Sequence, residues 1–284
     1  MKILITGAQG QLAQEIHRRL ESKNYDTTVL DKIKLNITDF SRALKIISEV
    51  KPDIVINCAA YNDVDRSEID WETAFLVNGI GVKNLAISCN ENNAILVHFS
   101  TDYVFDGQKG KPYTIADRPN PINRYGESKL LGEEFLKNHL ERYFLIRTSW
   151  VFGEGKFSFP KKLIEWASNN KKLKIVDDQI SSPSYTLDMA SAVTDLIQTE
   201  NYGLYHITNS GSCSKYTWSE FILKAIKWDG EIEPAKSEEF ASPAKRPLFS
   251  ALDNFPLKET IGYLLPSWQD ATERFFKKGH KGDR

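Results

Sequence analysis

The chain has few cysteines and no long apolar run, and both absences restrict where it works. Its three cysteines, Cys58, Cys89 and Cys213, are scattered without a C-x-x-C pair, which is typical of reduced thiols in a reducing compartment. No apolar stretch approaches the roughly 18 to 20 residues that span a bilayer. The opening MKILITGAQG is too short for a secretory signal and is followed by no small-residue cleavage site. We therefore expect a cytoplasmic protein without a membrane partner.

The chain also lacks an excess of either charge. Its net charge is −1 over 284 residues, whereas a nucleic-acid binder usually carries a basic excess. An anionic ligand would therefore be held by a few placed groups and not by a global field. The hydrophobic share of 41% is ordinary for a globular protein and supplies a sizeable core.

Short apolar runs alternate with longer amphipathic stretches over residues 1–150. The short runs are apolar on both faces, which fits strands of a sheet that is covered on both sides. Strands that alternate with helices predict a parallel sheet with right-handed crossovers. We predict strands at 2–6, 27–30, 53–59, 95–100 and 143–148, and helices at 11–23, 40–50, 71–92 and 125–140.

This alternation loosens after residue 150. Helices are expected at 159–167, 187–198, 218–226 and 268–276, extended segments at 173–176 and 204–207, and irregular loops where prolines cluster between 234 and 266. The predicted fold is α/β, a Rossmann-type doubly wound parallel sheet with a smaller C-terminal α+β region. Residues 1–150 would bind a dinucleotide, and 151–284 would mainly shape a substrate cleft, with some elements returning to the sheet.

A glycine turn, GAQGQLA (7–13), follows the first predicted strand and opens a helix. Glycine permits a tight turn and lets the backbone approach a pyrophosphate, while the helix N-terminus points N–H groups at the anion. Gly7 and Gly10 therefore predict a dinucleotide site, the alternative being a tight turn without a ligand. Asp31, after the second strand, favours the 2′-hydroxyl of NAD, whereas Lys32 could pair with a 2′-phosphate. The choice of cofactor stays open at this point.

Tyr125 and Lys129 lie four residues apart at the start of a predicted helix, so both can point into one cleft. A tyrosine with an ordinary pKa near 10 is a poor acid–base catalyst, and an adjacent ammonium lowers that pKa. Thr101 and Asp102 end the fourth predicted strand, at the edge where ligands bind in open α/β sheets. Thr101 could then donate a hydrogen bond to the carbonyl oxygen that Tyr125 protonates. The alternatives are an ordinary half-buried tyrosine and a Thr–Asp turn.

Taken together, these segments resemble the extended short-chain dehydrogenase/reductases and, within them, the dTDP-4-dehydrorhamnose reductase family. The resemblance covers nearly the whole chain, and its most specific segments are STDYVFDG (100–107) and RTSW (147–150). The other matching segments are TGAQGQL (6–12), NCAAY (57–61) with Val64 and Asp65, YGESK (125–129), Asp178 with Gln179, and AKRP (244–247).

The resemblance implies reduction of the 4-keto group of dTDP-4-dehydro-L-rhamnose to dTDP-L-rhamnose, a step of deoxysugar and polysaccharide biosynthesis. Tyr125 would protonate the oxygen, Lys129 would lower the tyrosine pKa and hold the nicotinamide ribose, and Thr101 would polarise the carbonyl. Asp102 would bind the sugar, and Trp150 the sugar or the nucleotide, with core packing as its alternative.

The family also implies a cofactor, NADPH or NADH, with a lean toward NADPH. The residues that would contact this cofactor are Gly7, Gly10, Gln11, Leu12, Asp31, Lys32, Asn36, Ile37, Ala60, Tyr61 and Asn62, together with Tyr125 and Lys129. Arg246 is the candidate for the substrate pyrophosphate, because a guanidinium makes bidentate contacts with phosphates; a surface salt bridge is its alternative.

Three positions depart from the family pattern and bear on the cofactor. Ala13 replaces a usual glycine, Asn36 stands where aspartate is frequent, and Asn62 where threonine is common. Glu15 matches a position through which some members bind Mg²⁺ at a dimer contact, but no metal is assigned. The partner expected is a nucleotide sugar, with the protein a monomer or a homodimer.

Three other functions are alternatives to this one. Sugar-nucleotide dehydratases of the superfamily carry Thr-Asp-Glu at the fourth strand end, and here Tyr103 follows Asp102. A reductase of another nucleotide-linked 4-keto-6-deoxysugar stays open. So does a non-catalytic, cofactor-binding partner, since a regulatory subunit of methionine adenosyltransferase resembles the same family; intact Thr101, Tyr125 and Lys129 argue against it.

Overall fold

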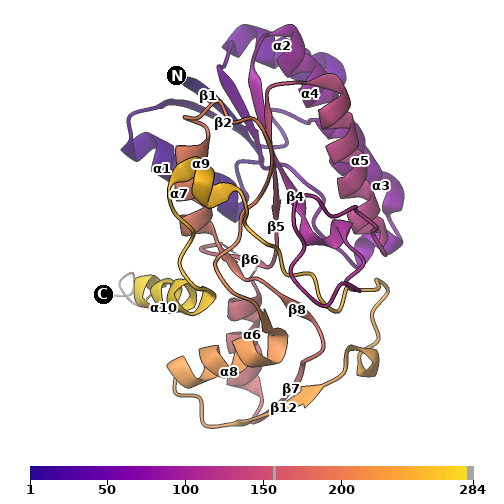
Figure 1. Cartoon of the computed structure of the whole chain (residues 1–284), viewed down its shortest axis with the longest axis vertical. Helices are drawn as coiled ribbons and strands as arrows, with labels where there is room; N and C mark the ends of the chain where they lie inside the picture. Colours follow the sequence, from indigo (N-terminus) through magenta and orange to yellow (C-terminus); the bar gives the residue numbers. More distant parts are fainter. Residues whose placement is uncertain (156–157, 280–284) are drawn as a thin grey trace.

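A six-stranded parallel sheet organises the upper part of the molecule in the computed structural model, which describes residues 1–155 and 158–279 (Figure 1). The strand order is β10-β5-β4-β3-β1-β2. The strand that follows β1 in the chain, β2, lies on one side of β1, and the next strand, β3, lies on the other side. This reversal of strand order opens a crevice at the carboxyl ends of β1 and β3. The predicted doubly wound parallel sheet is confirmed. The strands are β1 (Lys2–Thr6), β2 (Asp26–Leu30), β3 (Ile54–Asn57), β4 (Ile95–Thr101), β5 (Tyr143–Thr148) and β10 (Gly203–His206).

Helices cover both faces of this sheet (Figure 1). Alternate side chains of β1 explain why: Ile3 and Ile5 pack into the core on one face and Leu4 into the core on the other. One layer holds α1 (Gln11–Ser22), α7 (Thr186–Leu196) and α9 (Leu257–Ile261), and the other holds α2 (Phe40–Val50), α4 (Gly81–Glu91) and α5 (Arg124–His139).

The long helix expected at 71–92 is divided in the structure. It consists of α3 (Trp71–Phe75), a π-helical turn η2 (Leu76–Ile80) and α4. A Cβ at Gly132 of α5 would lie 2.2 Å from the carbonyl oxygen of Asn78, so the two helices touch backbone to backbone at this turn. A π-turn is often found at functional sites, and here it directs Asn78 toward the loop after β3.

The lower part of the molecule is built mainly from residues after 150 and has its own core (Figure 1). That core is rich in aromatic side chains, among them Phe152, Trp218 and Trp268. Its elements are β6 (Val151–Phe152), α6 (Phe159–Asn169), β7 (Lys172–Val176), β8 (Ile180–Ser181), β9 (Ser184–Tyr185), β11 (Cys213–Ser214), α8 (Lys215–Ala225), β12 (Glu231–Ala235), η4 (Ser237–Glu239) and α10 (Trp268–Gly279).

Several details differ from the sequence-based expectation. The sequence does not predict the short strands β6, β8, β9 and β11, because two-residue strands carry no periodicity. The proline-rich stretch expected to form irregular loops also contains regular structure, since β12 includes Pro234 and α9 begins directly after Pro256. The helix α8 begins at Lys215, three residues before the expected start, because Ser214 caps it by accepting a hydrogen bond from the backbone N–H of Thr217. None of the described helices combines the length and hydropathy needed to cross a bilayer.

Candidate active site

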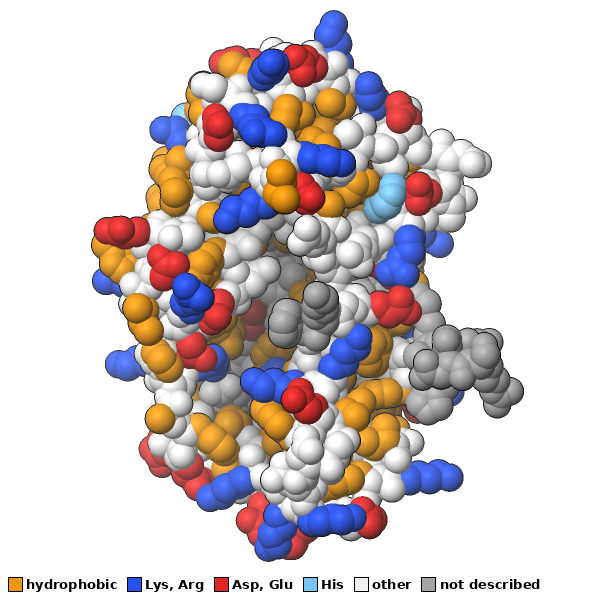
Figure 2. Space-filling view, turned by 180° about the vertical axis from the view of Figure 1, so that it is seen from behind, with side chains coloured by type: hydrophobic (Ala, Val, Ile, Leu, Met, Phe, Trp, Pro, Cys, Tyr) orange, Lys and Arg blue, Asp and Glu red, His pale blue; other side chains and the backbone are white. Residues whose placement is uncertain are grey.

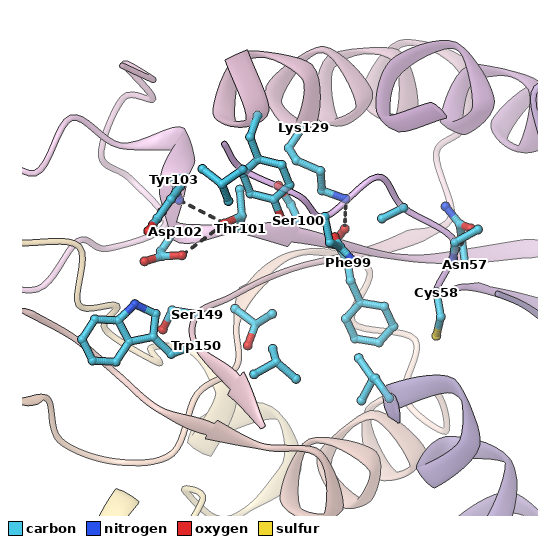
Figure 3. A pocket seen from close by; sticks show the side chains of 18 of the residues that line it. Asn57, Cys58, Phe99, Ser100, Thr101, Asp102, Tyr103, Lys129, Ser149 and Trp150 are labelled. Atoms are coloured by element: carbon cyan, nitrogen blue, oxygen red, sulfur yellow. Dashed lines mark hydrogen bonds between the residues drawn. The ribbon is translucent and has the colours of Figure 1, made fainter. Parts of the chain in front are cut away.

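A pocket of about 370 Å³ lies at the carboxyl ends of β3, β4 and β5, where the two parts of the chain meet (Figure 3). The face shown in Figure 2 is hollowed between these parts, and side chains of both charges are interspersed around it. The lining residues are Gln11, Leu12, Asn57, Cys58, Ala59, Ala60, Asn62, Val64, Phe99, Ser100, Thr101, Asp102, Tyr103, Tyr125, Lys129, Thr148, Ser149, Trp150 and Val151.

The glycine turn brings two backbone segments together at the floor of this site. Gly7 has a φ of +70°, and a Cβ there would lie 2.7 Å from the backbone nitrogen of Ala59. Gly10 is the N-cap of α1 and has no side chain to accept from the first helical N–H groups, and the first turn carries no acidic residue. An uncapped helix N-terminus beside a side-chain-free turn suits a pyrophosphate, so these residues fit a dinucleotide.

The loop after β3 is held in place by two asparagines. Asn57 Oδ1 accepts from Thr6 Oγ1 at 2.6 Å and from the backbone nitrogen of Ala59 at 3.1 Å. Asn78 exchanges hydrogen bonds with the backbone of Tyr61, at 2.9 and 3.0 Å, and donates to Ser128 at 3.0 Å. The loop that lines the pocket is therefore tied to both the sheet and α5, which fixes its position at the pocket wall.

Asp102 links the two parts of the chain. Its Oδ2 accepts hydrogen bonds from Ser181 at 3.0 Å and Ser250 at 2.5 Å, and its Oδ1 accepts from Thr101 at 3.1 Å. Burial raises the pKa of the Asp102 carboxyl to about 6, against the opposing effect of these three hydrogen bonds. The carboxylate is thus fixed at the pocket wall and titrates close to neutrality.

The start of α5 carries Tyr125 into the pocket. Asn123 caps the helix by accepting from the Gly126 backbone nitrogen at 2.8 Å and donates to the Lys245 carbonyl at 2.7 Å. A Cβ at Gly126 would lie 2.2 Å from the Tyr103 carbonyl oxygen, so only glycine lets α5 approach the end of β4 this closely. The approach places Tyr125 beside Thr101.

The phenol of Tyr125 behaves differently from the expectation. Burial raises its pKa above the ordinary value, a hydrogen bond with Thr101 opposes the rise, and the charge of Asp102 adds to it. Lys129 makes no contribution to this shift, and its ammonium donates to the Phe99 carbonyl oxygen at 2.6 Å (Figure 3). The phenol is therefore protonated at neutral pH, which is the form that a proton donor requires.

Lys129 is buried near the ion pair that Glu133 forms with Arg147. Burial lowers its pKa to about 8, while the charge of Glu133, one turn further along α5, raises it. Glu133 receives two hydrogen bonds from Arg147 of β5, at 2.9 and 2.6 Å, and one from Ser100 at 2.6 Å. Glu133 and Arg147 are both fully buried, so this pair joins α5 to the two strands that carry the site.

Trp150 lines the pocket from the start of the C-terminal region. Its φ of +41° is left-handed, a conformation that bulky residues rarely adopt. Its ring stacks on Trp218 with centroids 6.0 Å apart, so the tryptophan both packs on the aromatic core and forms part of the pocket surface.

Arg246 does not line the pocket. It forms a two-pronged ion pair with Asp65, with Nη1–Oδ1 at 3.0 Å and Nη2–Oδ2 at 2.7 Å, and it also donates to Ser242 and interacts with Tyr103. The structure therefore shows the ion pair that was the alternative for Arg246. A phosphate would have to displace Asp65 from it.

The other predicted cofactor residues lie beside the pocket and not in its lining. Asp31 closes a turn by accepting from the backbone of Ile33 and Lys34 at 3.1 and 3.0 Å. Tyr61 points its hydroxyl to Asp70 at 3.1 Å. Ile37 is buried in the core against Gly81. Four more predicted residues lie outside the lining: Gly7, Gly10, Lys32 and Asn36.

The remaining predicted site residues are within the lining. For the cofactor these are Gln11, Leu12, Ala60, Asn62, Tyr125 and Lys129, and for the substrate Thr101, Asp102 and Trp150.

Sequence reasoning missed four residues that shape the site. Ser181 and Ser250 hold Asp102, Asn78 holds the loop after β3, and Lys215 lies against Trp150. The glycines around Asn78 and the serine before Lys215 were available signals, but no local pattern marks the two serines. Among residues 1–155 and 158–279, no three His, Cys, Asp or Glu side chains converge as a metal site.

The pocket presents a protonated phenol, a hydroxyl and a buried carboxylate at one edge of a dinucleotide-binding sheet. The phenol can give a proton to an oxygen, and the Thr101 hydroxyl can donate a hydrogen bond to the same oxygen. The carboxylate can accept from hydroxyl groups of a sugar. This combination fits reduction of a carbonyl group on a polyhydroxylated substrate.

Proteins of one family are similar to this chain over its length. The family model described as RmlD substrate binding domain matches residues 1–280. The spore coat polysaccharide biosynthesis protein SpsK of Bacillus subtilis is 36% identical, over 98% of this chain and 97% of its own length. The dTDP-4-dehydrorhamnose reductase of Aggregatibacter actinomycetemcomitans is 34% identical, over 95% and 96%. A crystal structure of dTDP-4-dehydrorhamnose reductase from Bacillus anthracis in complex with NADP has a TM-score of 0.95 and 37% identity, over 98% of this chain and 99% of that chain.

Proposed function

The chain belongs to the dTDP-4-dehydrorhamnose reductase family, and we propose that it reduces the 4-keto group of dTDP-4-dehydro-L-rhamnose to give dTDP-L-rhamnose. The observation that carries this proposal is the placement of a protonated Tyr125 beside Thr101 in a pocket at the dinucleotide-binding edge of the sheet. The reaction belongs to the biosynthesis of deoxysugars and polysaccharides.

The chain's own residues supply the proton and the orientation. The cofactor, held by the glycine turn and the first turn of α1, would supply a hydride when bound. Tyr125 donates its proton to the oxygen on C4. The Thr101 hydroxyl, which donates to Asp102 in this structure, turns to donate its hydrogen bond to that oxygen as negative charge develops on it. Asp102 accepts from sugar hydroxyl groups, and Trp150 covers the sugar with its ring. Lys129, with its ammonium beside Tyr125 on the same helix face, holds the nicotinamide ribose.

The cofactor is bound by the turn at Gly7 and Gly10 and by the first turn of α1, with Gln11 and Leu12 facing the pocket. We infer that NADPH is preferred to NADH. Lys32 is exposed next to Asp31, whose Oδ1 already accepts two backbone hydrogen bonds. Arg42 donates to the carbonyls of Ile33 and Lys34, so a second cation lies at the same turn.

Replacing Lys32 by alanine is expected to raise the KM for NADPH about tenfold, the effect of losing one charge-assisted contact with a phosphate. The KM for NADH should stay unchanged, because NADH has no 2′-phosphate. Initial rates with each cofactor at saturating substrate measure both values. Lys51→Ala is the control, because it removes an exposed lysine that directly follows the C-terminal end of α2. Equal changes for both cofactors in Lys32→Ala would contradict the assignment.

The titration of Asp102 predicts an acid limb in the pH profile. Below a pH of about 6 the carboxyl is protonated and can no longer accept from the two serines and the sugar together. We expect kcat/KM to fall as the pH drops through about 6. The limb should be absent in Asp102→Asn, which has a lower but pH-independent kcat/KM in this range. The same limb in both proteins would show that another group is responsible.

The proposed function is tested by following the reduced-nicotinamide absorbance when dTDP-4-dehydro-L-rhamnose is added to the protein with NADPH. Substrate-dependent oxidation of NADPH, with dTDP-L-rhamnose as the product, is the expected result. Binding of NADPH without oxidation would contradict the proposal and would favour another 4-keto sugar nucleotide or a non-catalytic partner role.

We infer that the protein acts on small molecules in the cytoplasm, as a monomer or a homodimer. In support, Cys58, Cys89 and Cys213 are free thiols. The net charge of −1 offers no field for nucleic acid.

A further inference from the structure

Lys215 is a cation that lies against the ring of Trp150, a residue of the pocket lining. Its Nζ lies 3.5 Å from the ring centroid of Trp150, 4.4 Å from that of Phe159 and 5.3 Å from that of Trp218. The residue keeps some exposed surface, but its ammonium is enclosed by these rings. In the described part of the chain, no carboxylate forms an ion pair with it.

This environment is unfavourable for an isolated charge. Loss of hydration lowers the pKa of Lys215 to about 7, and the nearby charge of Arg246 acts in the same direction. The charge of Asp102 attracts the ammonium, but among the described residues the two side chains form no ion pair, and the hydrogen bonds to Asp102 come from Ser181, Ser250 and Thr101. Cation–π contacts offset only part of the lost hydration. A dianionic ligand would supply the missing counter-charge.

Arg246 and Lys215, the two cations on the C-terminal side of the pocket, differ in whether a carboxylate pairs with them. Arg246 is occupied by Asp65, whose own pKa is held below its usual value mainly by the hydrogen bond from Arg246. Lys215 has no such partner, and it lies against Trp150, which forms part of the pocket lining. It is therefore the cation available to a ligand that extends from the sugar position toward the C-terminal part of the chain.

We propose that Lys215 binds the diphosphate of the nucleotide sugar, with the sugar between Thr101 and Trp150 and the diphosphate on the Lys215 side of Trp150. This inference rests on the proposed function and assigns to Lys215 the role first predicted for Arg246. The diphosphate carries two negative charges, and its binding would draw the ammonium from the aromatic rings into a charge-assisted contact.

Binding of dTDP-glucose tests the proposal without turnover, because this diphosphate sugar has no ketone to reduce. Titration in the presence of NADPH can be followed by calorimetry or by the fluorescence of Trp150 and Trp218. We expect Lys215→Met to weaken binding about 10- to 100-fold with NADPH affinity unchanged. Lys215→Arg should bind within a few-fold of the parent. Lys162→Met, which removes an exposed lysine 5.2 Å from the Trp166 ring, should bind as the parent does.

Two results would overturn the inference in distinguishable ways. If Lys215→Met binds dTDP-glucose as tightly as the parent, Lys215 is not the diphosphate ligand, and the proposed function is untouched. If the parent binds NADPH but no dTDP-glucose, both the subsite and the proposed substrate class are wrong. Retained NADPH affinity in each variant shows that the chain is folded.

The pH dependence offers a second readout. Deprotonation of Lys215 above a pH of about 7 should weaken binding of dTDP-glucose progressively toward pH 9, because the neutral amine no longer attracts the diphosphate. The other groups near Lys215 are Asp102, Arg246 and Cys213, with Asp177 hydrogen-bonded to Ser214. Asp102 has a pKa of about 6 and Cys213 of about 12, so neither titrates in that window. Lys129 of the pocket lining has a pKa of about 8 and titrates there in the parent and in each Lys215 variant alike. Lys215→Arg should therefore show a shallower decline than the parent, and a decline equal to that of the parent would contradict the proposal.

Discussion

Replacing Tyr125 by phenylalanine is expected to lower kcat by about 10²- to 10⁴-fold, the contribution typical of a positioned proton donor. Phenylalanine keeps the ring but has no proton to give to the oxygen on C4. The affinity for NADPH should stay near that of the parent, because the glycine turn and the first turn of α1 are unchanged. Steady-state oxidation of NADPH gives kcat, and quenching of protein fluorescence gives the NADPH dissociation constant.

Tyr103→Phe is the matched control for this variant. Tyr103 is a second half-buried phenol of the same pocket, with its ring centroid 6.0 Å from that of Tyr125, but its hydroxyl interacts with Arg246. Its loss should lower kcat less than about tenfold, the smaller effect of removing one hydrogen bond that is not made to the reacting oxygen. If Tyr125→Phe turned over at nearly the parent rate, Tyr125 would not be the acid.

Replacing Arg147 by methionine is expected to destabilise the protein by about 3 to 5 kcal/mol, because it leaves the Glu133 carboxylate buried without its main partner. Glu133 would keep only the hydrogen bond from Ser100, at 2.6 Å, and Lys137 at 3.6 Å. Urea unfolding followed by fluorescence measures the loss in the free energy of unfolding.

Two further variants separate an ion-pair effect from a general loss of packing. Glu133→Leu combined with Arg147→Met should be more stable than Arg147→Met alone, because the double variant buries no unpaired charge. Lys45→Met breaks the exposed Lys45–Glu49 pair and should cost less than about 1 kcal/mol. If Arg147→Met were no more destabilising than Lys45→Met, the buried pair would not be holding α5 to the sheet.

The central sheet could be predicted because its strands are buried on both faces and therefore read as continuous apolar runs. Lys2–Thr6 and Tyr143–Thr148 were predicted with the bounds that the structure has. The grouping of Thr101, Tyr125 and Lys129 was also predictable, because a strand end and the start of a helix meet at the same edge of a parallel sheet.

What could not be predicted depends on contacts between distant segments. Asp102 is fixed by Ser181 and Ser250, which lie 79 and 148 residues further along the chain. The pairing of Arg246 with Asp65 joins residues 181 positions apart. Local spacing carries no information on such pairs, so the sequence alone left the phosphate role and the salt bridge of Arg246 open as alternatives.

The expected effect of Lys129 on Tyr125 shows a second limit. Spacing along the helix predicted that the ammonium would lower the phenol pKa, whereas burial is the largest effect on that pKa and raises it. Helical spacing places two side chains on one face, whereas their partners and hydration depend on the strands packed beneath them.

The most direct test is transfer of deuterium to the sugar from NADPH that carries deuterium at both positions of nicotinamide C4. With dTDP-4-dehydro-L-rhamnose as substrate, we expect dTDP-L-rhamnose with deuterium at C4, identified by nuclear magnetic resonance and mass spectrometry. A product with no deuterium at C4, or no sugar product while NADPH is bound, would contradict the claim that this chain reduces the 4-keto group.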